Sequence, residues 1–426
     1  MEWIFSLVAF VLLLTGMPIS MILAAMTFLL IYSTTSLSPE LIPQQMFRAV
    51  DSTILMAVPF FILAGNIMTR GSLARRIIKF INSIVGGISG GLAVTSVLAC
   101  MFFAAISGSS PATLVAIGSI MIPALLQAQY GQRFSVGLLT CAGSLGILIP
   151  PSIPMIVYCL IMGTSVTRQF AAGFGPGIVM GIIFMIYSFL ISRKEGWHGE
   201  RRESWRQISR AFYEGFWALM LPFIVLGGIY SGIMTPTEAA AVSVGYGLLI
   251  DLLIYRELKI SELPRIMAES AVFSGCLMFI LACAMAFSWY LTSEQIPAKI
   301  STILLEFVGR PWVFLMMVNI IFLILGCFID VISAMLIVCP LLLPMLQELK
   351  IDLYHFGIIV VFNMEIGFMT PPFGVNLFVS SGVTKLPLLY VTRSVIPFLL
   401  LMLFALILIT YLPGVSLYIP DLFAIK

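Results

Sequence analysis

Charged residues are scarce in this sequence, and their scarcity excludes an ordinary soluble protein. Only 10% of the 426 residues are Asp, Glu, Lys or Arg, whereas 61% are hydrophobic. Soluble domains carry roughly 25% charged residues. Apolar stretches of about 20 residues, the length that crosses a bilayer, recur from end to end. The net charge of +3 is spread over short polar junctions, which excludes the concentrated basic surface of a nucleic-acid-binding protein. The composition predicts an all-α polytopic membrane protein.

Groups that support catalysis or metal binding are equally scarce. The chain has two histidines, His198 and His355, and no Gly-Lys pair, which excludes a phosphate-binding loop of the Walker A type. An intramembrane enzyme would need a nucleophile with a base, or a metal constellation. We therefore expect neither an enzyme nor a cofactor. Seven cysteines contain no C-x-x-C pair and are expected to be inert core residues: Cys100, Cys141, Cys159, Cys276, Cys283, Cys327 and Cys339.

One stretch of the chain has a distant copy later in the sequence. The stretches are 118–158 and 339–379. Pro123, Gly146, Pro150 and Pro151 recur 221 positions later as Pro344, Gly367, Pro371 and Pro372. Each copy pairs two short apolar arms with a longer helix that a Pro-Pro pair interrupts. The repeat predicts one structural unit that occurs twice.

The two short arms of each copy meet at a polar junction, "AISGSSPAT" (105–113) or "CFIDVISA" (327–334). Each arm has about 15 residues, which reach roughly 22 Å as a helix, whereas the bilayer core is about 30 Å thick. We therefore expect two re-entrant hairpins.

The basic junctions predict opposite orientations for the two copies. Lys and Arg are concentrated in 69–79, 192–210 and 256–265, which the positive-inside rule places in the cytoplasm. Counting crossings then puts the N-terminus in the cytoplasm and the C-terminus in the periplasm, with Arg168 as an exception outside. Met1–Tyr32 has no basic start or cleavage site and is expected to be a retained first helix. The count makes the repeat an inverted one.

An amphipathic segment precedes each hairpin. In 72–85, Leu73 and Ile77 share one face while Arg75, Arg76 and Lys79 lie on the other, which is typical of a helix in the membrane interface. The segment 296–309 repeats the pattern. An ordinary cytosolic loop helix is the alternative.

The Pro-Pro pairs predict two sodium sites. Proline removes the hydrogen bond to the carbonyl four residues earlier, and such a carbonyl at membrane depth needs a partner. A hard cation such as Na⁺ is satisfied by oxygen ligands alone. The first predicted site joins the first tip to the first break and comprises Ser107, Gly108, Ser109, Gly146 and Ile147. The second joins the second tip to the second break and comprises Gly326, Asp330, Gly367, Phe368 and Thr370.

Between these two sites the pattern predicts a pocket for an anion, because broken-helix N-termini favour negative charge. Candidate substrate contacts are Ser109, Ser110, Ser152 and Asn376. Asp330, ionisable at membrane depth, is a candidate Na⁺ ligand or proton carrier. Glu365 completes the second ion site or serves helix packing through a hydrogen bond. The polar residues of the first tip, alternatively, only cap a turn.

The chain divides into nine predicted segments. They are scaffold helices (1–71), an interfacial arm (72–88), a first transport unit (89–165), a transmembrane helix (166–191), a cytoplasmic loop (192–211), further scaffold helices (212–294), a second interfacial arm (295–310), a second transport unit (311–384) and a C-terminal transmembrane helix (385–426).

Five stretches together resemble a known family. They are "PFFILAGNIMTRG" (59–71), "FAAISGSSPATLVAIGS" (103–119), "GSLGILIPPSIPMIVY" (143–158), "GGIYSGIMTPTEAAAV" (227–242) and "NMEIGFMTPPFGVNLFV" (363–379). In this order they closely resemble the large membrane subunit of tripartite ATP-independent periplasmic (TRAP) transporters, of the C4-dicarboxylate type, over essentially the full chain.

The resemblance implies a bacterial inner-membrane permease with Na⁺ as coupling ion. It implies a small four-helix membrane subunit and a periplasmic substrate-binding protein as partners, and an elevator movement of the hairpin units against a scaffold. The implied substrate is a small organic anion, a C4-dicarboxylate first and sialic acid or another sugar acid next. The alternative is a self-sufficient Na⁺/H⁺ antiporter or anion carrier of the same superfamily.

Overall fold

The structure, a computed structural model, consists of helices wherever it is described. It describes residues 12, 15–35, 38–197, 199, 203–307 and 309–425, with the backbone alone for 303–307, and within these ranges every regular element is a helix. Seven helices in this part of the chain are long and apolar enough to cross a membrane, or up to nine if each of two bent pairs counts as one span. The predicted class, an all-α polytopic membrane protein, is confirmed.

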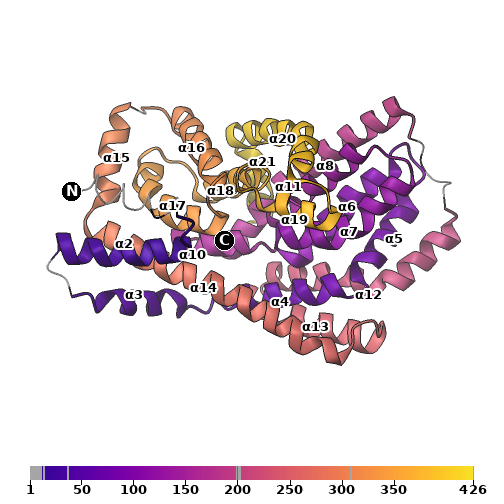
Figure 1. Ribbon diagram of the computed structural model, residues 1–426, viewed down its shortest axis with the longest axis horizontal. Coiled ribbons are helices and arrows are strands. Elements are labelled where there is room, and N and C mark those ends of the chain that lie inside the picture. The colour runs from indigo at the N-terminus through magenta and orange to yellow at the C-terminus, as the bar shows by residue number, and fades with distance from the viewer. Residues whose placement is uncertain are drawn as a thin grey trace.

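Six helices form one layer along the lower edge of Figure 1. They are α2 (Ile19–Thr34), α3 (Leu41–Val50), α4 (Ala57–Arg70), α12 (Trp205–Tyr230), α13 (Pro236–Leu249) and α14 (Leu263–Ser293). The long α14 packs against α2, α3 and α4, and α13 packs against α4 and α12. Short π and 3₁₀ turns, η1 (Ile250–Ile254) and η2 (Ile260–Glu262), connect α13 to α14. A capping box starts α13, since Thr235 and Glu238 bond each other's backbone N–H. We call this layer the scaffold layer.

The two repeated units lie above that layer in Figure 1. The first contains α6 (Gly91–Ser107), α7 (Ser110–Gln127), α8 (Gln132–Ala142), α9 (Leu145–Leu148) and α10 (Ile153–Met162). The second contains α16 (Pro311–Gly326), α17 (Val331–Glu348), α18 (Leu353–Gly367) and α19 (Val375–Thr384). Helices α7 and α17 have 18 residues each and begin 221 positions apart. The starts of α8 and α18 are also 221 positions apart. The remaining helices are α11 (Val166–Glu195), α20 (Leu388–Tyr411) and α21 (Gly414–Leu422), with the arms α5 (Leu73–Val85) and α15 (Ile296–Phe307).

The units exchange contacts reciprocally. Helix α7 of the first unit packs against α19 of the second, and α17 of the second packs against α10 of the first. Since α7 corresponds to α17 and α10 to α19, the two contacts are the same contact made twice, as a two-fold relation requires. The arms α5 and α15 lie at opposite ends of the view in Figure 1. This arrangement is the one that an inverted repeat needs, and the orientation of each unit in the membrane stays a prediction.

The arms of the hairpins are longer than the sequence predicted. They have 17 and 18 residues in the first unit and 16 and 18 in the second. Eighteen residues reach about 27 Å, close to the thickness of the bilayer core, so arm length argues for re-entrance only in the two shorter arms, α6 and α16. The contact of each tip with a helix break, described below, is a better reason to place the tips at mid-depth.

Several predicted boundaries also change. Within the predicted helix over Met1–Tyr32, the described helix α2 begins at Ile19, after Pro18. Residues 1–11, 13 and 14 of that prediction lie outside the described residues. The loop over 192–211 is shorter, because α11 extends to Glu195 and α12 begins at Trp205; His198 within it is also outside the described part. The segment 385–426 contains two helices rather than one.

Cys276 is exposed and Cys327 partly exposed, so the prediction that every cysteine is a core residue was wrong.

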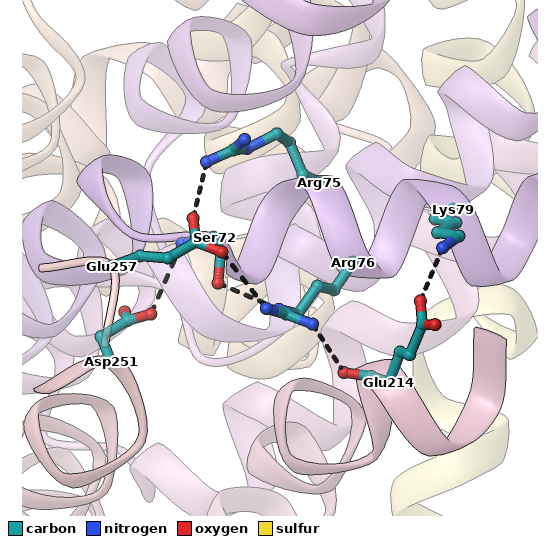
Figure 2. A network of polar contacts seen from close by, with 7 residues as sticks. All are labelled: Ser72, Arg75, Arg76, Lys79, Glu214, Asp251 and Glu257. Atoms are coloured by element: carbon teal, nitrogen blue, oxygen red, sulfur yellow. Dashed lines mark hydrogen bonds and ion pairs between the residues drawn. The ribbon is translucent and has the colours of Figure 1, made fainter. Parts of the chain in front are cut away.

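The arm α5 is bonded to the scaffold layer through its cationic face (Figure 2). Arg76 donates from Nε to the Ser72 hydroxyl at 3.1 Å, from Nη1 to the Glu214 carbonyl at 3.2 Å and from Nη2 to Glu257 at 3.2 Å. Its guanidinium also lies 3.8 Å from the centroid of the Tyr255 ring. Arg75 pairs with Glu257. Arg75 and Arg76 of α5 therefore have their partners within the protein.

The opposite face of α5 is apolar and faces the first unit. Leu73, Ile77 and Ile81 are buried, as the amphipathic pattern predicted, while Ile84 is exposed. Helix α5 packs against α6 on this side and against α12 on the other. It therefore connects the first unit to the scaffold layer.

Replacing Arg76 should weaken this connection more than replacing Arg75 on the same helix. Arg76→Ala removes three hydrogen bonds and a ring contact from a side chain that is 26% exposed, which predicts a loss of about 2 kcal/mol of unfolding free energy. Arg75→Ala removes one ion pair from a side chain that is 65% exposed and should cost about 0–1 kcal/mol. Thermal unfolding of the purified variants in detergent measures the difference. Equal midpoints for the two variants would contradict the anchoring role of Arg76.

Candidate functional site

In both units the hairpin tip touches the break of the following helix. The Ile153 N–H, just past the first break, donates to the Gly108 carbonyl at 3.2 Å. The Phe373 N–H, in the second break, donates to the Cys327 carbonyl at 3.2 Å. Each bond joins backbone that belongs to no helix ladder on either side, which is how irregular backbone is satisfied at membrane depth. The tip and the break therefore form one structural centre in each unit.

Glycine permits the close approach at both centres. A side-chain carbon on Gly146 would lie 2.5 Å from the Ser109 carbonyl oxygen and 2.6 Å from the Thr113 hydroxyl. A side-chain carbon on Gly367 would lie 2.5 Å from the backbone of Gly326. The structure thus brings Ser109 to Gly146, and Gly326 to Gly367, as the two predicted sodium sites require. Whether Na⁺ binds there stays a prediction.

The second centre has fewer free oxygens than the sequence predicted. The carbonyl of Gly367 accepts from the Thr370 N–H at 2.9 Å, and that of Phe368 accepts from the Asn376 N–H at 3.1 Å. The prolines remove the usual donors, but the turn itself supplies others. The expectation that these two carbonyls are stranded was wrong, although each carbonyl keeps a second lone pair.

Asp330 also caps a helix, a role that the sequence did not predict. It is the N-cap of α17, where its Oδ2 accepts the N–H groups of Ile332 at 3.1 Å and Ser333 at 3.0 Å. The Ser333 hydroxyl donates to its other oxygen. A carboxylate offers about four lone-pair positions, so this cap still leaves one for a cation. Ser109 is the corresponding N-cap of α7, 221 positions earlier.

A buried polar cluster joins the two units to each other. Ser110 of α7 donates to Glu365 of α18 at 2.5 Å, and Asn376 of α19 donates to Ser110 at 2.5 Å and to Glu365 at 3.1 Å. All three side chains are fully buried. Two of the predicted substrate contacts, Ser110 and Asn376, therefore meet, but they are enclosed in this conformation. The hydrogen-bonded packing role of Glu365 is the one that these contacts support.

A cavity of about 310 Å³ lies beside the first tip. Ser107, Ser109 and Pro111 line it from the hairpin, and Ile153 lines it from the start of α10. We call it the tip cavity. Its volume is at the lower end of the range of about 300–1,000 Å³ that is usual for small-molecule pockets.

Two helices begin at the tip cavity. The N-cap of α7 is Ser109 and that of α10 is Ser152, and neither hydroxyl bonds to the backbone of its own helix. The Ser152 hydroxyl is fully buried and has no hydrogen-bond partner among the described residues. Helix N-termini carry partial positive charge and unpaired N–H groups, so the cavity favours an anion.

The scaffold layer supplies the other wall, which was not predicted from the sequence. Asn66 and Thr69 of α4, with Glu269 and Phe273 of α14, line the cavity opposite the tip. Asn66 donates to the Ser270 hydroxyl at 2.8 Å, which ties α4 to α14. A signal for this wall is present in the sequence, since Asn66 is a polar residue within the apolar stretch 59–68.

Comparisons with known proteins agree with this arrangement. The family model described as "Tripartite ATP-independent periplasmic transporter, DctM component" matches residues 6–415. The C4-dicarboxylate TRAP transporter large permease protein DctM of Pseudomonas aeruginosa is 47% identical over 377 residues, 88% of each chain. The sialic acid TRAP transporter large permease protein SiaM of Vibrio cholerae is 34% identical over 97% of this chain and 96% of its own.

A solved structure shows the same fold at low sequence identity. The YdaH transporter of Alcanivorax borkumensis matches with a TM-score of 0.65 over 93% of this chain and 97% of that chain, at 12% identity. The fold, the two tip-and-break centres and the family match lead to one conclusion. The chain belongs to the DctM component family of tripartite ATP-independent periplasmic transporters, and it is a multi-pass membrane permease of that family.

Proposed function

We propose that this permease imports a small organic anion across the bacterial inner membrane, with a C4-dicarboxylate as first choice and sialic acid or another sugar acid next. The observation that carries the proposal is the tip cavity, which Ser109, the N-cap of α7, and Ile153, the first residue of α10, both line. Negative charge is stabilised at such a place without a buried cation. The name of the Pseudomonas relative supports the dicarboxylate, and that of the Vibrio relative supports the second choice.

Na⁺ is the proposed coupling ion, held at the two tip-and-break centres. The first centre brings the Ser109 carbonyl and the Thr113 hydroxyl against Gly146, and the second brings the Gly326 carbonyl against Gly367. Close packing of oxygens is what a hard cation needs. Cations bound on either side would offset the cost of dehydrating the anion. Because linkage is reciprocal, Na⁺ then raises the affinity for the substrate and the substrate raises the affinity for Na⁺.

The proposed movement is an elevator movement of the two units against the scaffold layer. The units are bonded to each other through Ser110, Glu365 and Asn376, so they move as one body. The arm α5 is anchored to the scaffold layer through Arg76 and packs against the first unit. The proposed orientation has a cytoplasmic N-terminus and a periplasmic C-terminus, as the basic junctions predict.

The proposed partners are those of a tripartite transporter, a small four-helix membrane subunit and a periplasmic substrate-binding protein. We infer transport rather than catalysis, since the cavity offers binding groups and the family is one of permeases. A self-sufficient carrier would need neither partner.

Reconstitution tests the function directly. Proteoliposomes that contain this chain and its small subunit, with binding protein outside, should accumulate labelled succinate when a Na⁺ gradient points inward. Uptake should fall to background when the gradient is removed or either partner is left out. Equal uptake by this chain alone would favour the self-sufficient carrier and contradict the tripartite proposal.

Asp330→Asn tests the second ion centre. Asn caps helices about as well as Asp, so the variant should fold and assemble normally while it lacks the charge for Na⁺. We expect Na⁺-dependent uptake to be lost or to fall at least about tenfold, the effect of roughly 1.4 kcal/mol. Asp330→Ala is the companion variant, since it loses the cap as well and should also unfold at lower temperature. Full Na⁺-driven uptake by Asp330→Asn would remove this carboxylate from the ion site.

A further inference from the structure

The mouth of the tip cavity carries an ion pair that neither the family match nor the transport proposal explains. Glu269 of α14 lines the cavity, and the Arg70 guanidinium, next to the cavity-lining Thr69, is paired with its Oε2. Arg265 binds the other oxygen of Glu269 at 2.9 Å from the preceding turn of α14. The three side chains carry a net charge of +1 at the opening of a cavity that favours an anion.

The pair is built so that it opens easily. The side chains of Arg70 and Glu269 are 34% and 44% exposed, and water and salt weaken an ion pair at such exposure. If Arg70 turns away, Glu269 keeps Arg265 as a partner and no charge is left unpaired. Arg70 and Arg265 each have Glu269 as their one printed partner in the described part of the chain. Arg70 follows the cavity-lining Thr69, whereas no residue next to Arg265 lines the cavity, so Arg70 is the group that another carboxylate can recruit.

The position of Arg70 relative to the helix N-termini fits a ligand with two carboxylates. The termini of α7 and α10 take one carboxylate at the tip. Arg70 ends α4 on the scaffold side and its guanidinium is paired with the cavity-lining Glu269. Its planar fork matches a carboxylate with two parallel hydrogen bonds. A ligand with one carboxylate uses only the tip.

We propose that Arg70 is a specificity residue that exchanges Glu269 for the second carboxylate of the substrate at the mouth of the tip cavity. This inference rests on the proposed function, because it needs an organic dianion as substrate. No bond is made or broken in the exchange except hydrogen bonds, and each cation keeps an anionic partner throughout. Arg70 acts from the scaffold layer, so the contact holds only while the first tip stands beside α4.

Trans-inhibition isolates this contact from the specificity of the binding protein. Succinate sealed inside the proteoliposomes slows further uptake by occupying the inward-facing cavity, and the internal concentration that halves the uptake rate reports the affinity there. Arg70→Gln should raise that concentration about tenfold, the usual effect of losing a charged hydrogen-bond partner. Arg70→Lys should raise it less, because charge remains without the fork. Glu269→Gln should lower it, since it removes the competing carboxylate.

Two controls separate recognition from a structural tie between α4 and α14. The first is succinamate, the monoamide of succinate, whose half-inhibiting concentration should be the same in Arg70→Gln and wild type. The second is Arg210→Gln, since Arg210 forms a comparable exposed pair with Glu214 four residues later on α12, away from the cavity. Arg210→Gln should leave the half-inhibiting concentrations of succinate and of succinamate unchanged.

The outcomes are distinct. An unchanged half-inhibiting concentration of succinate in Arg70→Gln, or an equal rise for succinate and succinamate, would overturn the assignment of Arg70 while leaving the transport function intact. A variant that only loses maximal uptake rate would indicate a structural tie and overturn it too. If the wild-type complex takes up no succinate, the proposed substrate class fails, and this inference fails with it.

Discussion

The backbone that leaves the helices at two Pro-Pro pairs must find hydrogen-bond partners without water, and the rest of this structure depends on that constraint. An unsatisfied peptide group in hydrocarbon costs several kcal/mol. The protein meets the cost by bringing a hairpin tip against each break, so that Gly108 and Cys327 offer carbonyls to the N–H groups of Ile153 and Phe373. Two hairpins are needed because there are two breaks. The repeat is thus a consequence of the same constraint applied twice.

The tips and breaks also explain why polar side chains gather where the two units meet. Helices that begin at a tip or a break point their N-termini into the protein, where polar groups are favourable. Ser110 and Asn376 lie at the starts of two such helices, α7 and α19, and Glu365 lies near the end of α18; the three form a buried network between the units. These buried hydrogen bonds fix the relative position of the three side chains. A movement of one unit without the other would break it, which is why we treat both units as one body.

Much of this arrangement could be predicted from the sequence, and the rest was inaccessible for identifiable reasons. The repeat at 221 residues, the breaks at Pro150 and Pro371 and the pairing of tip with break followed from proline chemistry and spacing. The bonds that Thr370 and Asn376 make to Gly367 and Phe368 did not, because a turn's alternative donors depend on its dihedral angles. Nor did the scaffold wall of the cavity, because Asn66 and Glu269 are about 200 residues apart and no local pattern connects them.

The tip cavity has one wall on the repeated units and one on the scaffold layer, and this division has a consequence for transport. Ser109 and Ile153 belong to the body that we propose to move, whereas Asn66, Thr69 and Glu269 belong to the layer that stays. A substrate carboxylate at the helix N-termini would travel with the units, while any contact with the scaffold wall must be broken at each passage. Strong contacts on the fixed wall would hold the substrate back, so weak and exchangeable ones are favoured there. The Thr69 hydroxyl and the partly exposed ion pair of Glu269 on that wall are of this kind, and the helix N-termini at the tip are not.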